Sequence, residues 1–276
     1  MRTWFVTGVS SGFGRSLSEL LVSRGERVVG TLRNEAQRAA FDAISPGLSV
    51  GVLLDVTRHD EVAAVVDEVE RRIGAIDVLV NNAGYGYEGT VEEATMVEIR
   101  AQFDVNVFGA VAVAQAVLPH MRRRRSGRII NITSMGGIAT FAGLGIYHGS
   151  KFALEGISET LAKEVRQFGI HVTAVEPGGF RTQWAAGSMR RGALTVTDYE
   201  PLMAPIRKAR VERSGQQTGD PSKAALAMLA LADAEDPPVH LLLGSDALGF
   251  VRTKLGELTR DIDRWEALTS STDFTG

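Results

Sequence analysis

The segment Thr3-Trp4-Phe5-Val6-Thr7-Gly8-Val9-Ser10-Ser11-Gly12-Phe13-Gly14 decides the fold class. Its first five residues predict a buried strand, and an amphipathic segment with Leu17, Leu20 and Leu21 follows the glycines. This order of strand, glycine turn and helix is typical of a dinucleotide-binding unit, in which backbone N–H groups approach a pyrophosphate at the helix N-terminus. The spacing is Gly-x-x-x-Gly-x-Gly and not Gly-x-Gly-x-x-Gly, so a tight turn without a ligand stays an alternative.

Strand and helix patterns alternate along the rest of the chain. Further strands are predicted at residues 27–31, 48–54, 77–80, 128–132, 170–175 and 239–243. Helical patterns lie between them, and one runs over residues 101–121. The alternation is typical of a parallel α/β sheet, and no linker or internal repeat divides the chain.

The composition excludes several classes of protein. A formal net charge of -3 gives no overall attraction to nucleic acid or to an anionic membrane. The chain has no cysteine, hence no disulfide and no thiolate metal site, and no metal is expected. The N-terminus shows no signal-peptide pattern, and the longest apolar stretch, residues 105–118, is too short to span a bilayer. We therefore expect a cytoplasmic protein without nucleic-acid or membrane partners.

The end of the second strand indicates which dinucleotide is bound. An acidic residue there usually bonds the ribose 2′-hydroxyl of NAD, whereas an arginine accommodates a 2′-phosphate. This chain has Arg33 at that place and no acid until Glu35, which favours NADP(H); a solvated arginine at a helix start is the alternative. Ser11 can add a second phosphate contact.

Two later turns lie at the same predicted edge of the sheet. Asp55, after the third strand, accepts from the adenine amino group or caps the helix that begins near Arg58; the sequence leaves both open. Asn81-Asn82-Ala83-Gly84 follows the fourth strand, and asparagine readily bonds neighbouring peptides and so shapes turns. Ligands of open α/β sheets bind at this edge.

Tyr147-His148-Gly149-Ser150-Lys151 places a tyrosine and a lysine four residues apart, on one face of a helix predicted over residues 147–168. A free phenol titrates near ~10 and holds its proton too tightly for exchange at neutral pH. A nearby ammonium stabilises the phenolate, so we expect Lys151 to lower the pKa of Tyr147.

Two polar features of the helix over residues 101–121 have alternative readings. Asn106 either satisfies a local backbone group or holds an ordered water. The arginine run 122–125 is explained by the negative end of the helix, and nucleic-acid binding is the weaker alternative.

Taken in chain order, these pieces resemble the compact branch of the short-chain dehydrogenase/reductase family. The matching residues are Thr7, Gly8, Gly12, Gly14, Asp55, Asn81-Asn82-Ala83-Gly84, Asn106, Ser134, Tyr147, Lys151 and Pro177-Gly178. They cover about residues 3–182, and the last strand extends the match to about residue 245. The resemblance implies one Rossmann-type domain over residues 1–276, with a doubly wound parallel sheet of about seven strands in the order 3-2-1-4-5-6-7.

The resemblance also implies an NADP(H)-dependent oxidoreductase that transfers hydride between nicotinamide and a carbonyl or alcohol. Tyr147 would exchange the proton of the substrate oxygen, Lys151 would bond the nicotinamide ribose, and Ser134 would stabilise alkoxide charge. Asn106 would keep a water that links Lys151 to solvent. The cofactor contacts are expected from Gly8, Ser10, Ser11, Gly12, Phe13, Gly14, Arg33, Asp55, Val56, Asn82, Ala83, Gly84, Tyr147, Lys151, Pro177, Gly178 and Thr182. His148 is expected to face outward or an interface.

The expected substrate is an apolar or aromatic carbonyl compound. Residues that either line an apolar pocket or belong to the core are Gly84, Tyr85, Met135, Ile138, Phe141, Leu144, Trp184 and Met189. Residues 183–218 lack strong periodicity and read as a lid over the substrate, and residues 245–276 form a helical tail. The family's usual pairing implies a homodimer or homotetramer, and the tail favours the dimer because it can obstruct one interface.

Three rival functions come from other classes. The first is a non-catalytic NADP-binding sensor or scaffold, against which the intact Ser134, Tyr147 and Lys151 argue. The second, an isomerase or dehydratase with bound nicotinamide, normally goes with a large C-terminal substrate domain that this chain lacks. The third is a nucleic-acid-binding module based on residues 122–125.

Overall fold

The computed structural model describes residues 1–274, apart from the side chains of residues 185 and 186. Seven parallel strands form the central sheet in the order β3-β2-β1-β4-β6-β7-β9, which confirms the predicted strand order. The strands are β1 (Thr3–Val6), β2 (Arg27–Leu32), β3 (Ser49–Leu53), β4 (Val78–Asn81), β6 (Gly127–Ile132), β7 (Ile170–Pro177) and β9 (His240–Leu243).

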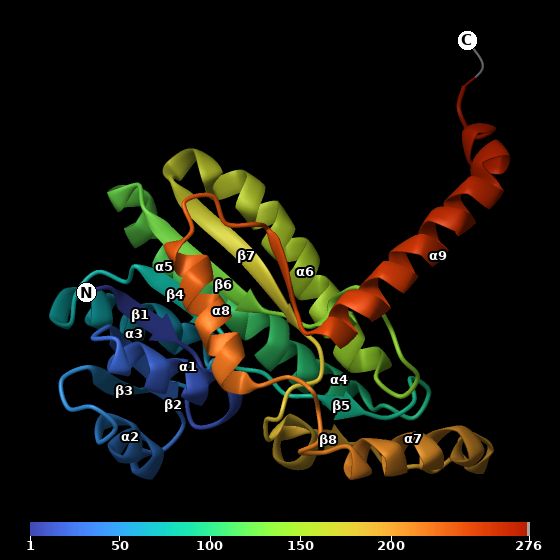
Figure 1. Cartoon of the computed structure of the whole chain (residues 1–276), viewed down its shortest axis with the longest axis horizontal. Helices are drawn as coiled ribbons and strands as arrows, with labels where there is room; N and C mark the ends of the chain where they lie inside the picture. The colour runs from blue at the N-terminus through green and yellow to red at the C-terminus, as the bar shows by residue number, and fades with distance from the viewer. Residues whose placement is uncertain (275–276) are drawn as a thin grey trace.

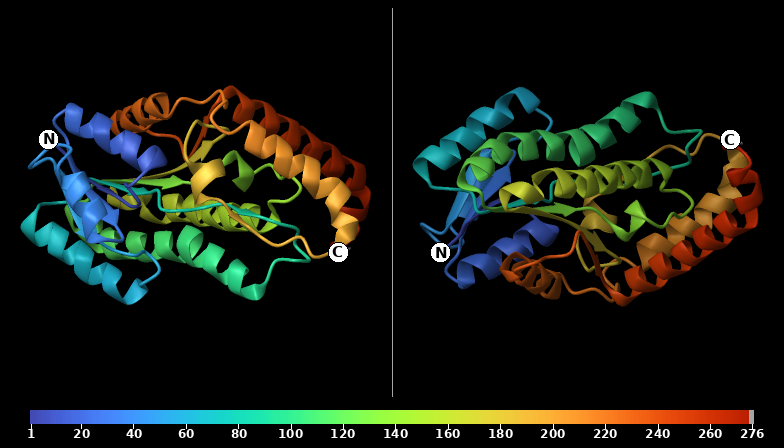
Figure 2. Two further views of the ribbon diagram at one scale, coloured as in Figure 1. Left: turned by 90° about the horizontal axis from the view of Figure 1, so that it is seen from below. Right: turned by 90° about the horizontal axis from the view of Figure 1, so that it is seen from above.

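Helices cover both faces of this sheet (Figures 1 and 2). One face packs against α1 (Gly12–Ser23), α2 (Glu35–Asp42) and α8 (Pro221–Asp233). The opposite face packs against α3 (His59–Arg72), α5 (Ala110–Arg124) and α6 (Gly145–Val165).

The strand sequences explain the two hydrophobic layers. Successive side chains of a strand point to opposite faces, so Trp4 packs in the α1 layer and Phe5 in the α3 layer. Both are completely buried. Because both faces are covered, the strands read as continuous apolar runs in the sequence.

The helix expected over residues 101–121 is longer and interrupted. It begins with α4 (Met96–Phe103), where Thr95 and Glu98 form a capping box, and passes through a π-helical turn, η1 (Asp104–Gly109), into α5. By length and composition alone, residues 96–124 pass as a membrane-spanning helix. The buried Val113, Val117 and Met121 pack in the α3 layer, as expected of a core helix.

The segment expected to lack periodicity, residues 183–218, contains regular structure. It holds a π-helical turn, η4 (Trp184–Ser188), the short β8 (Arg190–Arg191), a 3₁₀ turn, η5 (Thr197–Tyr199), and α7 (Glu200–Glu212). β8 pairs in parallel with β5 (Tyr87–Glu88), which fixes the segment to the body of the protein. The two remaining 3₁₀ turns are η2 (Met135–Gly137) and η3 (Arg166–Phe168).

The predicted tail is a single helix, α9 (Ser245–Ser270). Its first turns contact β9 and η2, and Figure 1 shows the rest extending away from the body. Its buried residues, Ala247 and Val251, belong to its first two turns.

Candidate active site

One large cavity of about 1160 Å³ opens at the carboxyl ends of the strands. It runs from the turn after β1 to the segment 183–218. Of the residues expected to bind the cofactor, all but Gly14 line it. The sequence therefore located the cavity correctly, whereas the contacts themselves stay predictions.

The turn between β1 and α1 has the geometry that a phosphate cradle needs. Gly8 and Gly12 adopt φ values of 73° and 59°, which other residues rarely tolerate. The Asn82 side chain donates to the backbone carbonyls of Thr7 and Gly8, both at 2.9 Å, and so fastens the turn. A Cβ at Gly14 would lie 2.4 Å from the Gly8 carbonyl oxygen, so Gly14 keeps α1 against the turn and does not face the cavity.

Arg33 and Asp55 lie together at the adenosine end of the expected site. Arg33 is exposed, lines the cavity and forms no salt bridge with any described residue. Asp55 accepts from the backbone N–H and hydroxyl of Thr57, and α3 begins at His59 with Arg58 as its N-cap. The helix-cap reading of Asp55 is therefore wrong. Burial acts against ionisation of Asp55, but the Thr57 bonds and the charge of Arg33 keep its pKa below the ordinary value.

The three groups expected to carry the chemistry meet at the other end of the cavity. Tyr147 lies in the first turn of α6, and its hydroxyl is hydrogen-bonded with Ser134, which follows β6. Lys151 lies one turn further along α6, with Nζ 5.9 Å from the centre of the Tyr147 ring. The Lys151 ammonium donates to the Ile132 carbonyl at 2.8 Å, which fixes its position.

The pKa of Tyr147 differs from the expectation. Burial raises it to about 12, and the hydrogen bond with Ser134 offsets only part of the rise. Burial also lowers the pKa of Lys151 to about 8. Desolvation therefore outweighs the Ser134 hydrogen bond, and Tyr147 is a neutral phenol that holds a proton at neutral pH.

Asn106 is almost completely buried within the π-helical turn η1. Its amide donates to the Tyr85 carbonyl at 3.0 Å and to Ser150 Oγ at 3.1 Å, and its Oδ1 accepts from the Tyr85 N–H at 3.1 Å. The side chain thus satisfies local backbone groups, the first of the two readings. A water held by Asn106 stays a prediction.

The expectation for His148 is wrong. The side chain is buried and lines the cavity, and its Nδ1 accepts from the Phe141 N–H at 3.3 Å. Burial lowers its pKa to about 4, so it is neutral at pH 7. The sequence pattern of α6 does not show that η2 covers His148. The two are in close contact, because a Cβ at Gly136 of η2 would lie 3.2 Å from the imidazole.

The apolar half of the cavity lies over Tyr147. Trp184 approaches the Tyr147 ring with a centroid separation of 5.2 Å, and Leu144 and Met189 pack beside the pair. All the expected pocket residues line the cavity except Ile138. Further lining residues that the sequence did not indicate are Ile206, Ala209 and Arg210 from α7, Arg213 directly after it, and Phe250 from α9.

One buried carboxylate fastens the segment 183–218 to the body. Glu88, at the end of β5, is completely buried and makes salt bridges with Arg207 at 3.1 Å, with Arg191 at 3.5 Å and with Arg210. Glu88 lies about 100 residues before these arginines in the chain, so no local sequence pattern indicates the cluster.

Comparison with known families now decides what kind of protein carries this site. A family model described as "short chain dehydrogenase" matches residues 2–191. The chain belongs to the short-chain dehydrogenase family. It is thus an oxidoreductase.

Related dehydrogenases and reductases match most or nearly all of the chain. A short-chain dehydrogenase from Streptomyces avermitilis is 40% identical, with a TM-score of 0.91 over 99% of this chain and 98% of its own. Oxidoreductase BOA17 of Botryotinia fuckeliana is 34% identical over 97% of this chain and 98% of its own. The 3-ketodihydrosphingosine reductase of Bacteroides thetaiotaomicron is 35% identical over 87% and 86%, and the NADPH-dependent 3-dehydrocapnine reductase of Ornithobacterium rhinotracheale is 32% identical over 78% and 79%.

Proposed function

We propose that this short-chain dehydrogenase is an NADP(H)-dependent carbonyl reductase, or alcohol dehydrogenase in the reverse direction. The observation that carries the proposal is the arrangement of Tyr147, Ser134 and Lys151 at one end of a cavity whose other end is a glycine-lined cradle. A scaffold or sensor has no need for a buried acid–base group, so this rival is the weaker one.

The chain's own residues supply proton transfer and charge stabilisation. Ser134 and Tyr147 present two hydroxyls to a substrate oxygen, and the neutral Tyr147 phenol donates its proton as that oxygen gains charge. Lys151, charged below its pKa of about 8, stabilises the phenolate that remains. The nicotinamide, when bound, supplies or accepts the hydride.

Arg33 supports a preference for NADP(H). Its guanidinium is exposed, has no salt-bridge partner among the described residues and lines the adenosine end of the cavity. A phosphate there gains a charge-assisted hydrogen bond, which contributes about 1.5–3 kcal/mol. The NADPH-dependent reductase among the relatives agrees with this preference.

The substrate proposal is an apolar or aromatic carbonyl compound. Trp184, Leu144 and Met189 form an apolar wall above Tyr147, and Phe141 and Phe250 contact each other edge-on at 5.0 Å at the rim. The names of two relatives refer to long-chain amino ketones, which fits such a wall. Residues 183–218 act as the lid of this pocket.

Exposed apolar residues and the composition of the chain support proposals for its oligomeric state and its location. Phe108, Phe152 and Ile157 are exposed on η1 and α6, the helices through which the family usually pairs, so we propose a homodimer or homotetramer. The absence of cysteine and the use of NADPH fit a cytoplasmic location.

Two measurements test the proposal. A panel of aldehydes and ketones of increasing chain length, followed by NADPH absorbance, is expected to give turnover that improves with apolar length. Tight NADPH binding with no turnover across the panel would favour the sensor.

The cofactor preference is tested separately with Arg33→Asp. This variant is expected to bind NADPH at least tenfold more weakly and NADH more tightly, as measured by fluorescence titration. Arg24→Asp is the matched control, because Arg24 is exposed at the end of α1 and does not line the cavity. Unchanged selectivity in Arg33→Asp would refute the role of Arg33.

A further inference from the structure

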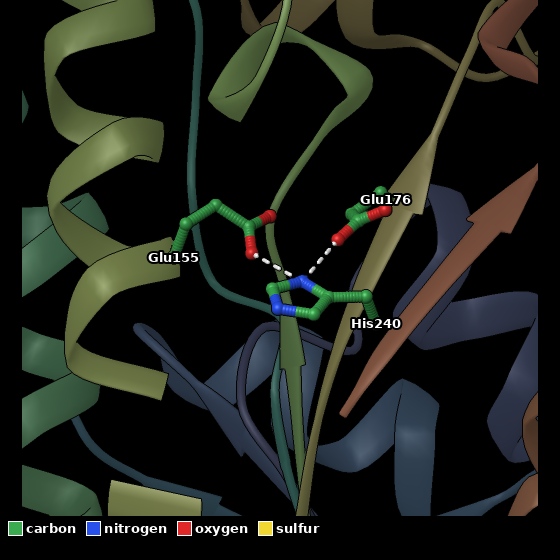
Figure 3. Close-up of side chains that lie close together, drawn as sticks. All are labelled: Glu155, Glu176 and His240. Carbon is green, nitrogen blue, oxygen red and sulfur yellow. Dashed lines mark hydrogen bonds and ion pairs between the residues drawn. The ribbon is translucent and has the colours of Figure 1, made fainter. Parts of the chain in front are cut away.

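Three titratable side chains outside the catalytic group converge between α6 and the edge of the sheet. Glu155 lies one turn beyond Lys151 on α6, Glu176 lies on β7 and His240 on the neighbouring β9 (Figure 3). His240 pairs with Ala174, two residues from Glu176, so both side chains leave the same face of the sheet. That face is the one that α6 covers.

The distances among these groups suit a shared ion. His240 Nδ1 lies 2.8 Å from Glu176 Oε1 and 3.4 Å from Glu155 Oε2, and the ligand atoms of all three lie within 4.8 Å of one another. Oxygen and nitrogen atoms at about 2.0–2.2 Å around a tetrahedral zinc ion are about 3.4 Å apart. Small rotations of the side chains are therefore enough to bind an ion.

The two carboxylates have few other polar partners, although Thr133 and Lys151 lie close enough to Glu155 to act on its charge. Glu155 is 7% exposed, and among the described residues neither of its oxygens has a hydrogen-bond donor. Glu176 is 1% exposed, and His240 is the only described basic residue in a salt bridge with either carboxylate. A divalent cation would stabilise the ionised form of these two buried carboxylates, which share the His240 imidazole as a neighbour. Burial also raises the pKa of both glutamates, to about 7 for Glu155.

We propose that Glu155, Glu176 and His240 bind one divalent transition-metal ion, with Zn²⁺ the best match to the ligand set. Two carboxylates and one imidazole are ligands that zinc accepts in protein sites. The His240 side chain is 44% exposed, which gives the ion a path from solvent and leaves a fourth position for water. The bound ion would tie α6, which carries Tyr147 and Lys151, to β7 and β9.

The test is zinc binding to the untagged full-length chain after treatment with a chelator. Isothermal titration with ZnCl₂ is expected to give one ion per chain, and zinc is expected to raise the melting temperature. Glu155→Gln and His240→Gln are each expected to weaken binding at least tenfold and to abolish the rise. His59→Gln, which removes an exposed histidine at the start of α3, is expected to bind zinc as the wild type does.

Each other outcome overturns the site. No binding by the wild type would mean that the two carboxyl groups share protons instead of an ion. Equal binding by wild type and His240→Gln would place the zinc elsewhere. If Glu155→Gln does not fold, His240→Gln decides alone, because its half-exposed side chain is not needed for the core.

An independent observation concerns the outer surface of α9. Its apolar residues are spaced alternately three and four apart: Leu248, Val251, Leu255, Leu258, Ile262 and Trp265. Beyond Val251 they are about half exposed, up to 60% for Ile262, although the helix extends away from the body (Figure 1). A stripe with this spacing is the narrow seam of a coiled coil.

We infer that the α9 seam pairs in antiparallel fashion with α9 of a second copy of this chain. In a parallel pair Asp261 would face Glu266 of the copy, which is repulsive. Antiparallel pairing sets Leu255 opposite Trp265 of the copy and Leu258 opposite Ile262. It also brings Arg252 near Glu266 at both ends, and these two attractive pairs outweigh the single like-charge contact between the two Asp261 residues near the two-fold axis.

The charge of the helix favours a protein partner over a membrane. Residues 252–266 carry four basic and four acidic side chains, so they have no net attraction to anionic lipid. A membrane-surface helix is usually basic with a broad apolar face. The alternating charges and the narrow seam suit a second copy instead.

The absence of cysteine makes the pairing directly testable. Asp261→Cys is expected to form a disulfide-linked dimer under mild oxidation, whereas Leu255→Cys, which meets its own copy only in a parallel pair, is not. The double variant Leu258→Lys/Ile262→Lys is expected to halve the native mass by light scattering. Thr253→Lys/Ala267→Lys, on the opposite face, is the matched control with unchanged mass. Unchanged mass in the seam variant, or binding to anionic vesicles by a monomer, would overturn the inference.

Discussion

Replacing Glu88 by glutamine tests how the proposed lid, residues 183–218, is held closed. Glu88 is completely buried, and its salt bridges reach Arg191 on β8 and Arg207 and Arg210 on α7. Glutamine keeps the size of the side chain and removes the charge. The change therefore acts on these three contacts and leaves the packing of β5 in place.

The size of the effect follows from the exposure of the partners. A hydrogen bond to a charged group contributes about 1.5–3 kcal/mol, and the arginine side chains are 17–34% exposed, so solvent weakens each contact. We expect closure of the lid to weaken by about 2 kcal/mol, which is about a 30-fold change in its opening equilibrium.

Limited proteolysis and steady-state kinetics measure this change. In Glu88→Gln, cleavage within residues 193–199 is expected to accelerate, and the KM for the carbonyl substrate to rise by up to about 30-fold. The Kd for NADPH is expected to stay within twofold, because the glycine turn and Arg33 are far from these contacts along the cavity. Unchanged proteolysis together with unchanged KM would refute the anchoring role of Glu88.

Glu92→Gln is the matched control. Glu92 accepts from the Tyr199 hydroxyl in the same segment at 2.6 Å, but this contact is exposed. Exposed polar contacts contribute less than about 1 kcal/mol, so proteolysis and KM are expected to change little.

Three further predictions concern the site itself. The kcat/KM for carbonyl reduction is expected to fall as pH rises through about 8, because Lys151 loses its charge there. Buried His148, with a pKa of about 4, does not titrate in this range. A flat profile to pH 10 would contradict the role of Lys151. Trp184→Ala removes an aromatic contact with Tyr147 worth about 0.5–1.5 kcal/mol. The KM for a bulky ketone is therefore expected to rise about two- to tenfold, with little change for a small aldehyde. Gly14→Ala is expected to weaken NADPH binding at least tenfold, because the added Cβ separates α1 from the glycine turn. Gly249→Ala is the control, since a Cβ there meets no atom within 4 Å and NADPH binding is expected to stay unchanged. Equal affinities of the two variants in fluorescence titration would contradict this role of Gly14.

The parts of the fold that depend on local pattern were predictable from the sequence. Continuous apolar strands and glycine or asparagine turns identified the seven-stranded sheet and the edge at which the cavity opens. Most residues that line the cavity were predictable, because all the parallel strands end at that edge of the sheet. Gly14 shows the limit, since only the structure reveals that it packs against the turn and does not line the cavity.

The remaining features depend on contacts between distant segments. Burial of Tyr147 by Trp184 and Met189 reverses the expected direction of its pKa shift, and no local spacing encodes that burial. The π-helical turn at Asn106 and the burial of His148 by η2 likewise arise from packing.

The most direct test of the account compares wild type with Tyr147→Phe under NADPH saturation, with the active ketone followed by NADPH absorbance. Removing the hydroxyl is expected to lower kcat at least 100-fold, because proton transfer by a positioned group contributes about 10²–10⁴-fold, while the Kd for NADPH stays within about twofold. A kcat within tenfold of wild type would show that another group transfers the proton and that Tyr147 is not the proton donor.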